Sequence, residues 1–223
     1  KIGVSGEATI LDQPLERGKI VLSLTNVTAE GSVFDGKFSF SIRIPSTITS
    51  GTQIVHATVE DESGNRGEQD LSVIVDPTPT AIAVASVKES YLPQELVKIM
   101  PALLDQAGDV IATDIGFILR DPKGKDIFTD TLPSNTEYEF PLPEYALPGG
   151  WMLHFFALEI EKDVQLMVGQ QITLAYFVEN HTLYITNKGN IRFSGPFKIQ
   201  YKGVEHDFTL VKEFALDANE TVA

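Results

Sequence analysis

The sequence predicts an all-β protein made of several two-sheet sandwich modules, and three observations lead to this class. Short segments alternate apolar and polar residues, turn-forming residues separate them every ~8–12 residues, and no stretch requires a helix of ordinary length. Residues 37–44 give the clearest alternation, with Phe38, Phe40, Ile42 and Ile44 on one face of the predicted strand. Such a pattern is typical of a strand with one buried face.

The first predicted module covers residues 1–77. Apolar residues again fall at every second position in its other strands, and Gly, Ser, Asp and Asn supply the turns between them. Residues 76–80 then interrupt the pattern with two prolines, which stiffen the backbone and remove two hydrogen-bond donors. We therefore expect an interdomain linker there. The other strands of this module are expected at 20–24, 55–59 and 71–75.

The second predicted module covers residues 80–162. Its turns at 105–109 and 121–124 are each expected to close a hairpin, because both are rich in turn-forming residues. The stretch 95–104 has the composition of a helix, but Pro101 would cost a helix ~3 kcal/mol, and an edge strand accepts it. The expected strands are 81–88, 96–104, 110–120, 126–131, 137–142 and 151–160.

The third predicted module covers residues 163–223. It also alternates at period two, but it offers only about four strands against the ~7 of a usual sandwich. Two explanations remain open: the module is incomplete, or its strands pack on the second module.

The composition restricts the partners. Lys and Arg number 17 against 31 acidic residues, and the net charge of −14 repels nucleic acid and anionic lipid. The chain has no cysteine, which excludes disulfides, thiolate metal sites and thiol nucleophiles and favours a prokaryotic source. No apolar run of about 20 residues occurs, so membrane attachment is expected only through an anchor outside these residues.

Residues 80–162 resemble the macroglobulin-type sandwich of the α2-macroglobulin and complement family. The similarity is carried by residues 91–97, 105–108, 121–124, 140–143 and 148–151, which match the family's strand openings and its Asp-Pro-x-Gly hairpin. Gln94 stands where the family usually has glycine. The resemblance implies a fold rather than an activity. The family's reactive thioester requires a cysteine, so covalent trapping of proteases is not implied.

The other two modules resemble components of prokaryotic cell-surface arrays. Residues 4–8, 34–38 and 59–65 are similar to immunoglobulin-like repeats of such proteins. Residues 183–190, with their Asn-x-Gly-Asn turn, are similar to adhesion-type modules of archaeal and bacterial envelope proteins. Together these resemblances imply tandem immunoglobulin-like and macroglobulin-like sandwiches located outside the cell or in its envelope.

No hydrolase or nucleotide-binding motif is present, so we expect no enzymatic activity, although a pair of carboxylates brought together by folding stays open. Asp61, Asn65 and Asp70 are candidate calcium ligands, because hard oxygen donors crowd this loop. The alternative is a solvated turn with no ion. Beyond calcium, no cofactor is expected.

Asn26, Asn180 and Asn219 begin Asn-x-Thr sequons and are candidate glycosylation sites. For the whole chain we expect a structural or adhesive ectodomain, as in a stalk or envelope component. The first alternative is a module that binds an extracellular protein or glycan through its loops. The second is an accessory region of an envelope hydrolase or protease inhibitor.

Overall fold

The computed structural model describes residues 2–202 and 207–223, and its regular elements are all strands, numbered β1 to β21. No helix occurs among these residues, which confirms the predicted all-β class. Accordingly, the described part of the chain contains no helix that could cross a membrane. The chain divides into two compact units, residues 1–80 with 104–111 and residues 81–103 with 112–223. The predicted division into three modules stays a prediction.

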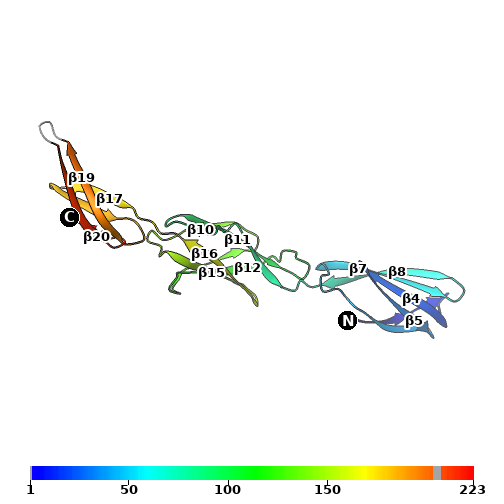
Figure 1. Cartoon of the computed structure of the whole chain (residues 1–223). Coiled ribbons are helices and arrows are strands. Elements are labelled where there is room, and N and C mark those ends of the chain that lie inside the picture. The colour runs from blue at the N-terminus through cyan, green and yellow to red at the C-terminus, as the bar shows by residue number, and fades with distance from the viewer. Residues whose placement is uncertain (1, 203–206) are drawn as a thin grey trace. The chain divides into compact units, whose positions relative to one another are not determined.

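The first unit is built on one antiparallel sheet with the strand order β1-β6-β5-β4-β7-β8. Figure 1 labels four of its strands, β4, β5, β7 and β8. β5 and β6 pair only at Phe34 and Lys37, around a two-residue turn. Ile42 of β6 nevertheless packs in one cluster with Leu22 and Leu24 of β4, so the sheet bends at this turn and encloses a core. The strands are β1 (Ile2–Glu7), β4 (Arg17–Leu24), β5 (Val27–Phe34), β6 (Lys37–Ile42), β7 (Gly51–Asp61) and β8 (Arg66–Val75), with a short hairpin of β2 (Thr9–Ile10) and β3 (Gln13–Pro14).

The alternation in β4 and β6 matches their burial. In β4 every second residue from Ile20 is buried, and in β6 the apolar positions are more buried than the polar ones. Phe40 is half-buried because its ring lies over Gly31, where an added β carbon would sit 2.5 Å from the ring. Glycine in a strand costs stability and leaves a gap, and the aromatic ring fills that gap.

The predicted linker and the following turn both form contacts in the first unit. Thr78 N donates to Gln106 Oε1 at 2.6 Å, and Gln106 Nε2 donates to the Ile48 carbonyl at 3.0 Å. The segment 105–109 does not close a strand hairpin as predicted: it closes one isolated bridge between Leu104 and Val110. The two flanking strands, β11 (Leu96–Leu104) and β12 (Asp114–Arg120), belong to different sheets.

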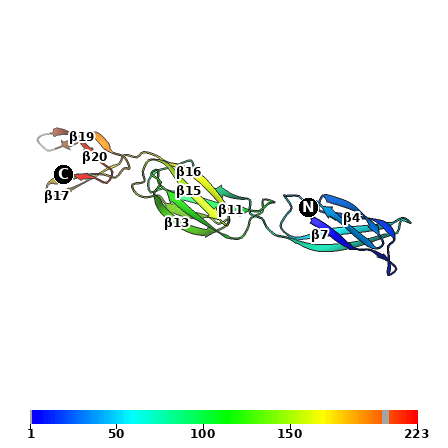
Figure 2. The same ribbon diagram turned by 90° about the horizontal axis from the view of Figure 1, so that it is seen from below.

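The second unit begins with two sheets, β10-β16-β15-β12-β13 and β14-β11-β9. Figures 1 and 2 both show β15 and β16 running alongside each other, as their nine-residue antiparallel register requires. Phe117 links the sheets, because its ring packs 5.9 Å from Phe155 of its own sheet and 5.7 Å from Phe140 of the other sheet. The bounds are β9 (Ala81–Ala85), β10 (Ser90–Tyr91), β13 (Asp126–Pro133), β14 (Tyr138–Pro141), β15 (Gly149–Ala157) and β16 (Ile160–Val168).

Two details of this sandwich differ from the sequence-based expectations. β11 lies in the centre of its sheet, so the expectation of an edge strand at Pro101 is wrong. The proline is tolerated because the pairing with β14 ends at Ile99, and the Pro101 carbonyl accepts a hydrogen bond from Asn135 N at 2.7 Å. β16 runs through Lys162, where the second module boundary is predicted, and completes the five-stranded sheet.

The C-terminal strands also belong to the second unit. They form a three-stranded sheet β17-β18-β21 and a long hairpin β19-β20. The rings of Phe193 and Phe197 both pack on Phe214, at centroid distances of 5.6 and 5.8 Å. The bounds are β17 (Leu174–Glu179), β18 (Thr182–Asn187), β19 (Phe193–Lys202), β20 (Asp207–Leu216) and β21 (Thr221–Val222).

Candidate functional site

The most extensive buried polar cluster lies at the Asn-x-Gly-Asn turn after β18. Asn187 has no exposed surface, and both ends of its amide are bonded. Its Nδ2 donates to the carbonyls of Ile191 at 2.8 Å and Leu216 at 3.1 Å, while its Oδ1 accepts from Gly189 N at 2.9 Å. The side chain therefore closes the turn on itself and attaches it to the end of β20.

Asn190 ties the same turn to the preceding sandwich. Its Nδ2 donates to the carbonyls of Ala146 and Gly169, both at 2.8 Å, and its Oδ1 accepts from Gln171 N at 2.7 Å. Asn190 N also donates to the Gln171 carbonyl at 2.9 Å. One amide that is 5% exposed thus joins the β14–β15, β16–β17 and β18–β19 connections. We call this arrangement the amide joint.

Glycine is required between the two asparagines. A β carbon at Gly189 would lie 2.2 Å from the Gln171 carbonyl oxygen and 2.8 Å from the Ile172 α carbon, which are backbone atoms that cannot move aside alone. The close approach brings Lys188 N to 2.6 Å from the Thr173 carbonyl. The turn sequence is therefore fixed by backbone packing as well as by its amides.

An exposed polar rim surrounds the amide joint. Tyr145 donates its hydroxyl hydrogen to Asn219 Oδ1 at 2.8 Å, and Lys188 Nζ lies 3.4 Å from the Tyr145 oxygen and 3.6 Å from Glu144 Oε1. The hydrogen bond with Tyr145, followed by the charges of Tyr145 and Glu144, raises the pKa of Lys188. Because these groups are exposed, the rim adds little stability compared with the buried amides.

The predicted calcium residues Asp61 and Asn65 form an ordinary turn. Asp61 Oδ1 accepts from the backbone N–H groups of Ser63 and Asn65, both at 2.8 Å, and Oδ2 accepts from Asn65 Nδ2 at 2.7 Å. The side-chain amide of Asn65 is the largest cause that lowers the pKa of Asp61, followed by the Asn65 backbone. Both oxygens of the Asp61 carboxylate therefore accept hydrogen bonds from groups within the turn itself.

Asp70, the third candidate, lies elsewhere. It stands opposite His56 in the β7–β8 register and its Oδ1 lies 2.6 Å from His56 Nδ1. His56 precedes Asp61 by five positions on β7, which is ~17 Å of extended strand. This geometry separates Asp70 from the other two candidates, and calcium binding at this loop stays a prediction. Within residues 2–202 and 207–223, no group of three or more His, Asp or Glu side chains is placed to hold a metal ion.

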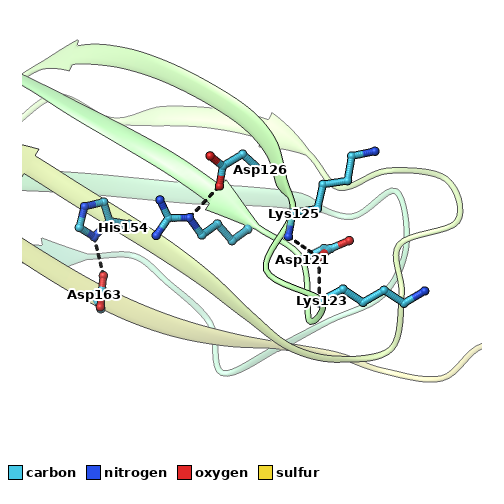
Figure 3. Close-up of polar contacts among 7 residues, drawn as sticks. Asp121, Lys123, Lys125, Asp126, His154 and Asp163 are labelled. Carbon is cyan, nitrogen blue, oxygen red and sulfur yellow. Dashed lines mark hydrogen bonds and ion pairs between the residues drawn. The ribbon is translucent and has the colours of Figure 1, made fainter.

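The same turn occurs twice more, at the two turns expected from the sequence at 105–109 and 121–124. Asp105 and Asp121 each accept two backbone N–H groups on Oδ1 at 2.8 to 2.9 Å, as Figure 3 shows for Asp121 with Lys123 and Lys125. Each Asp is followed three residues later by a glycine with φ between +80° and +88°. The repeated Asp-x-x-Gly spacing is the signal that identifies a structural turn.

Asp105 is the most buried of the three aspartates. Burial raises its pKa, but the Ser50 side chain and the backbone N–H groups of Asp109, Ala107 and Gly108 outweigh burial, so the net pKa lies below the ordinary value. Its Oδ2 is buried and has no hydrogen-bond partner of ordinary geometry among the described residues.

Two histidines form surface pairs across neighbouring strands. His154 Nδ1 on β15 lies 2.7 Å from Asp163 Oδ1 on β16 (Figure 3), and His56 pairs with Asp70 in the same way. Arg120 Nε contacts Asp126 Oδ1 at 2.7 Å close to the Asp121 turn. Polar cross-strand pairs of this kind stabilise a sheet surface modestly and provide no catalytic group by themselves.

The three sequons differ in their surroundings. Asn26 and Asn180 are exposed in the β4–β5 and β17–β18 turns. Asn219 is also exposed, but its Oδ1 accepts the hydrogen bond from Tyr145 and its N–H donates to the Asn187 carbonyl at 2.9 Å. The side chain of Asn219 therefore has a structural partner in the rim of the amide joint.

Comparisons with known proteins find a general likeness only among solved structures. No family model matches the sequence, and no curated protein does. A tetra-tandem repeat from the extending region of a large adhesion protein is 14% identical with a TM-score of 0.39; the match covers 99% of this chain, which spans 61% of that structure. The chicken CNTN1 FN1-FN3 domains are 8% identical with a TM-score of 0.39, covering 97% of this chain and 83% of theirs.

Fibronectin(III)-like modules of Clostridium thermocellum CbhA are 16% identical with a TM-score of 0.30, and the match covers 75% of this chain and 85% of theirs. At these values the similarity carries no information on ligand or activity. The architecture therefore rests on the strands described above, and the role of the chain must be argued from its own residues.

Proposed function

We propose that this chain is a non-catalytic structural segment of an extracellular or envelope protein, in which sandwich modules hold their neighbours at a fixed spacing. The observation that carries the proposal is the amide joint. Asn190 bonds three separate chain connections through one buried side chain. A flexible linker would instead be exposed and rich in polar or glycine residues.

Burial makes such a joint stiff. When any partner of a fully bonded buried amide moves away, the folded state loses stability, because the separated groups are left without a hydrogen bond to either protein or water. The sandwich connections and the C-terminal strands are thereby expected to move together. This behaviour suits a spacer, whose use depends on keeping its length and orientation.

The macroglobulin-type resemblance of residues 80–162, the prokaryotic source and the location outside the cell belong to the same proposal. The acidic surface and the exposed sequons at Asn26 and Asn180 support it. Partners among extracellular proteins or glycans are consistent with an adhesive role, and the absence of catalysis remains part of what we propose.

Spin labels test the fixed spacing. Because the chain contains no cysteine, Thr129→Cys in β13 and Lys198→Cys in β19 label two exposed strand positions without background. Pulsed electron resonance should give a narrow distance distribution for this pair. Adding Asn190→Ala should broaden the distribution severalfold.

A matched pair inside the sandwich controls for local disorder. Labels at Thr129 and Glu161, on β13 and β16, should give a narrow distribution with and without Asn190→Ala. A broad distribution between Thr129 and Lys198 in the unmodified joint would overturn the spacer proposal, because the joint would then be flexible.

A further inference from the structure

The sheet of the first unit has two free edges that face a common groove. β1 and β8 end the strand order and do not pair with each other among the described residues. Between them lies a groove of about 290 Å³ lined entirely by apolar side chains, including Val4, Leu24, Ile42 and Val73. The groove is therefore a gap in an otherwise continuous sheet whose floor is the hydrophobic core.

The β8 side of this groove is uncovered although its sequence has the pattern of a buried face. Leu71 and Val73 are 43% and 36% exposed, and Ile74 at the end of the strand is 79% exposed. Monomeric proteins rarely leave a contiguous apolar patch open, and such patches mark interaction sites. Burying these side chains would contribute ~25 cal/mol for each Å² removed from water.

The free edges indicate what kind of molecule covers the groove. An edge strand carries backbone N–H and C=O groups that another strand can pair with, and an extended peptide satisfies them while it inserts alternate side chains. A lipid or other small apolar ligand would fill the groove but leave both edges unpaired. The combination of two edges and an apolar floor therefore favours an added strand.

Charge indicates how that strand is oriented. Beyond Val4, Leu22 and Leu71 the groove continues between the start of β8 and the end of β1, where Glu7, Asp61 and Glu68 face it. Among the described residues that line this part, Arg66 is the one basic side chain, and it is ion-paired with Glu68 at 2.8 Å, so Glu7 and Asp61 leave two negative charges. An occupant is expected to carry a basic residue at this end.

We propose that the gap between β1 and β8 accepts an extended strand of a partner polypeptide. Because β1 and β8 run in opposite directions, an inserted strand pairs antiparallel with one edge and parallel with the other. We place the antiparallel pairing on β8, where Leu71, Val73 and Ile74 are exposed. Three alternate aliphatic residues enter the apolar part of the groove, and a Lys or Arg follows them beside Glu7. This surface is independent of the amide joint, so it adds a partner to the proposed spacer role.

A synthetic peptide tests the proposal on the full chain. The probe is an octapeptide of alternating threonine and valine with a C-terminal lysine, capped at both ends and fluorescently labelled. We expect saturable binding by fluorescence anisotropy and a higher melting temperature of the first unit. Val73→Lys, at a half-exposed groove position, should weaken binding at least tenfold.

Ile54→Lys is the matched control. Ile54 lies on the neighbouring strand β7, is 50% exposed and does not line the groove, so the same change there should leave binding unaltered. A peptide with its central valine replaced by proline should bind at least tenfold more weakly, because proline lacks the donor for strand pairing.

Three outcomes would overturn the proposal. The first is absence of binding at millimolar peptide, with the chain shown to be folded by circular dichroism. The second is equal binding by the proline peptide, which would indicate an apolar surface rather than a strand site. The third is a dimer in sedimentation velocity that Val73→Lys converts to a monomer, because a second copy would then occupy the groove.

Discussion

Asn190→Ala is the sharpest test of how the second unit is held together. The change removes a side chain that bonds two carbonyls and one N–H, the groups of Ala146, Gly169 and Gln171. Leaving one buried polar group unsatisfied costs ~1–3 kcal/mol, although water entering the vacated space recovers part of it. We therefore expect the free energy of unfolding to fall by ~3–5 kcal/mol.

Urea denaturation can measure this loss through the single tryptophan. Trp151 is 2% exposed, and its Nε1 donates to the Leu147 carbonyl at 2.7 Å, one residue beyond the Ala146 carbonyl that Asn190 holds. With a denaturant slope of ~2 kcal/mol/M, a loss of ~4 kcal/mol moves the midpoint by ~2 M. A loss under ~1 kcal/mol would refute the reasoning, because the joint would then contribute no more than one ordinary hydrogen bond.

Two further variants separate the amide from its surroundings. Lys188→Ala removes the exposed contacts of the same turn and should cost less than ~1 kcal/mol. Asn190→Asp keeps the shape but directs a carboxylate at two carbonyl oxygens, so the pKa of the new acid is raised in the folded state. Protonation then favours folding, and the stability loss should grow as pH rises from 4 to 8. Equal loss at both pH values would contradict this electrostatic account.

Three other predictions use different parts of the chain. The melting temperature should be the same in calcium and in chelator, because the turn itself uses the Asp61 carboxylate; a shift of several degrees would contradict this. The hydrogen bond from the Tyr138 hydroxyl lowers the pKa of Asp130, so the ionised carboxylate stabilises the fold above the ordinary Asp pKa, and this stability is lost as pH falls through the lowered pKa. Asp130→Asn should therefore reduce the loss of folding free energy at acid pH, and an unchanged dependence of stability on pH would contradict this. Expression in a glycosylating host should modify Asn26 more fully than Asn219, which peptide mass spectrometry measures.

The strands were predictable where local pattern decides the structure. Alternation in residues 37–44 identified β6 and its inward face, and the expected span 96–104 coincides with β11. The hairpin at 121–124 is confirmed by the pairing of β12 with β13, whereas that at 105–109 is wrong. Both turns have the same Asp-x-x-Gly spacing, so local sequence alone could not separate them. The difference lies in which sheet each following strand joins.

The candidate site depended on contacts distant in sequence. The Asn-x-Gly-Asn turn is recognisable in the sequence, but the hydrogen-bond partners of Asn190 lie 19, 21 and 44 residues away. The spacing of apolar residues and the composition carry no information on partners at such separations. The calcium hypothesis stays a prediction, and its residues show the opposite situation. Asp61 and Asn65 are close in sequence, and their carboxylate and amide bind each other and the turn backbone.

β8 is the place where pattern and structure disagree in an informative way. Its residues Leu71, Val73 and Val75 alternate as those of β4 do, yet β4 is buried and β8 is largely exposed. The two strands differ in neighbours: β4 lies between β5 and β7, whereas β8 has β7 on one side and the free groove on the other. An alternating apolar face is expected where a strand is covered. The pattern of β8 therefore argues that a further strand belongs beside it, which the peptide experiment measures directly.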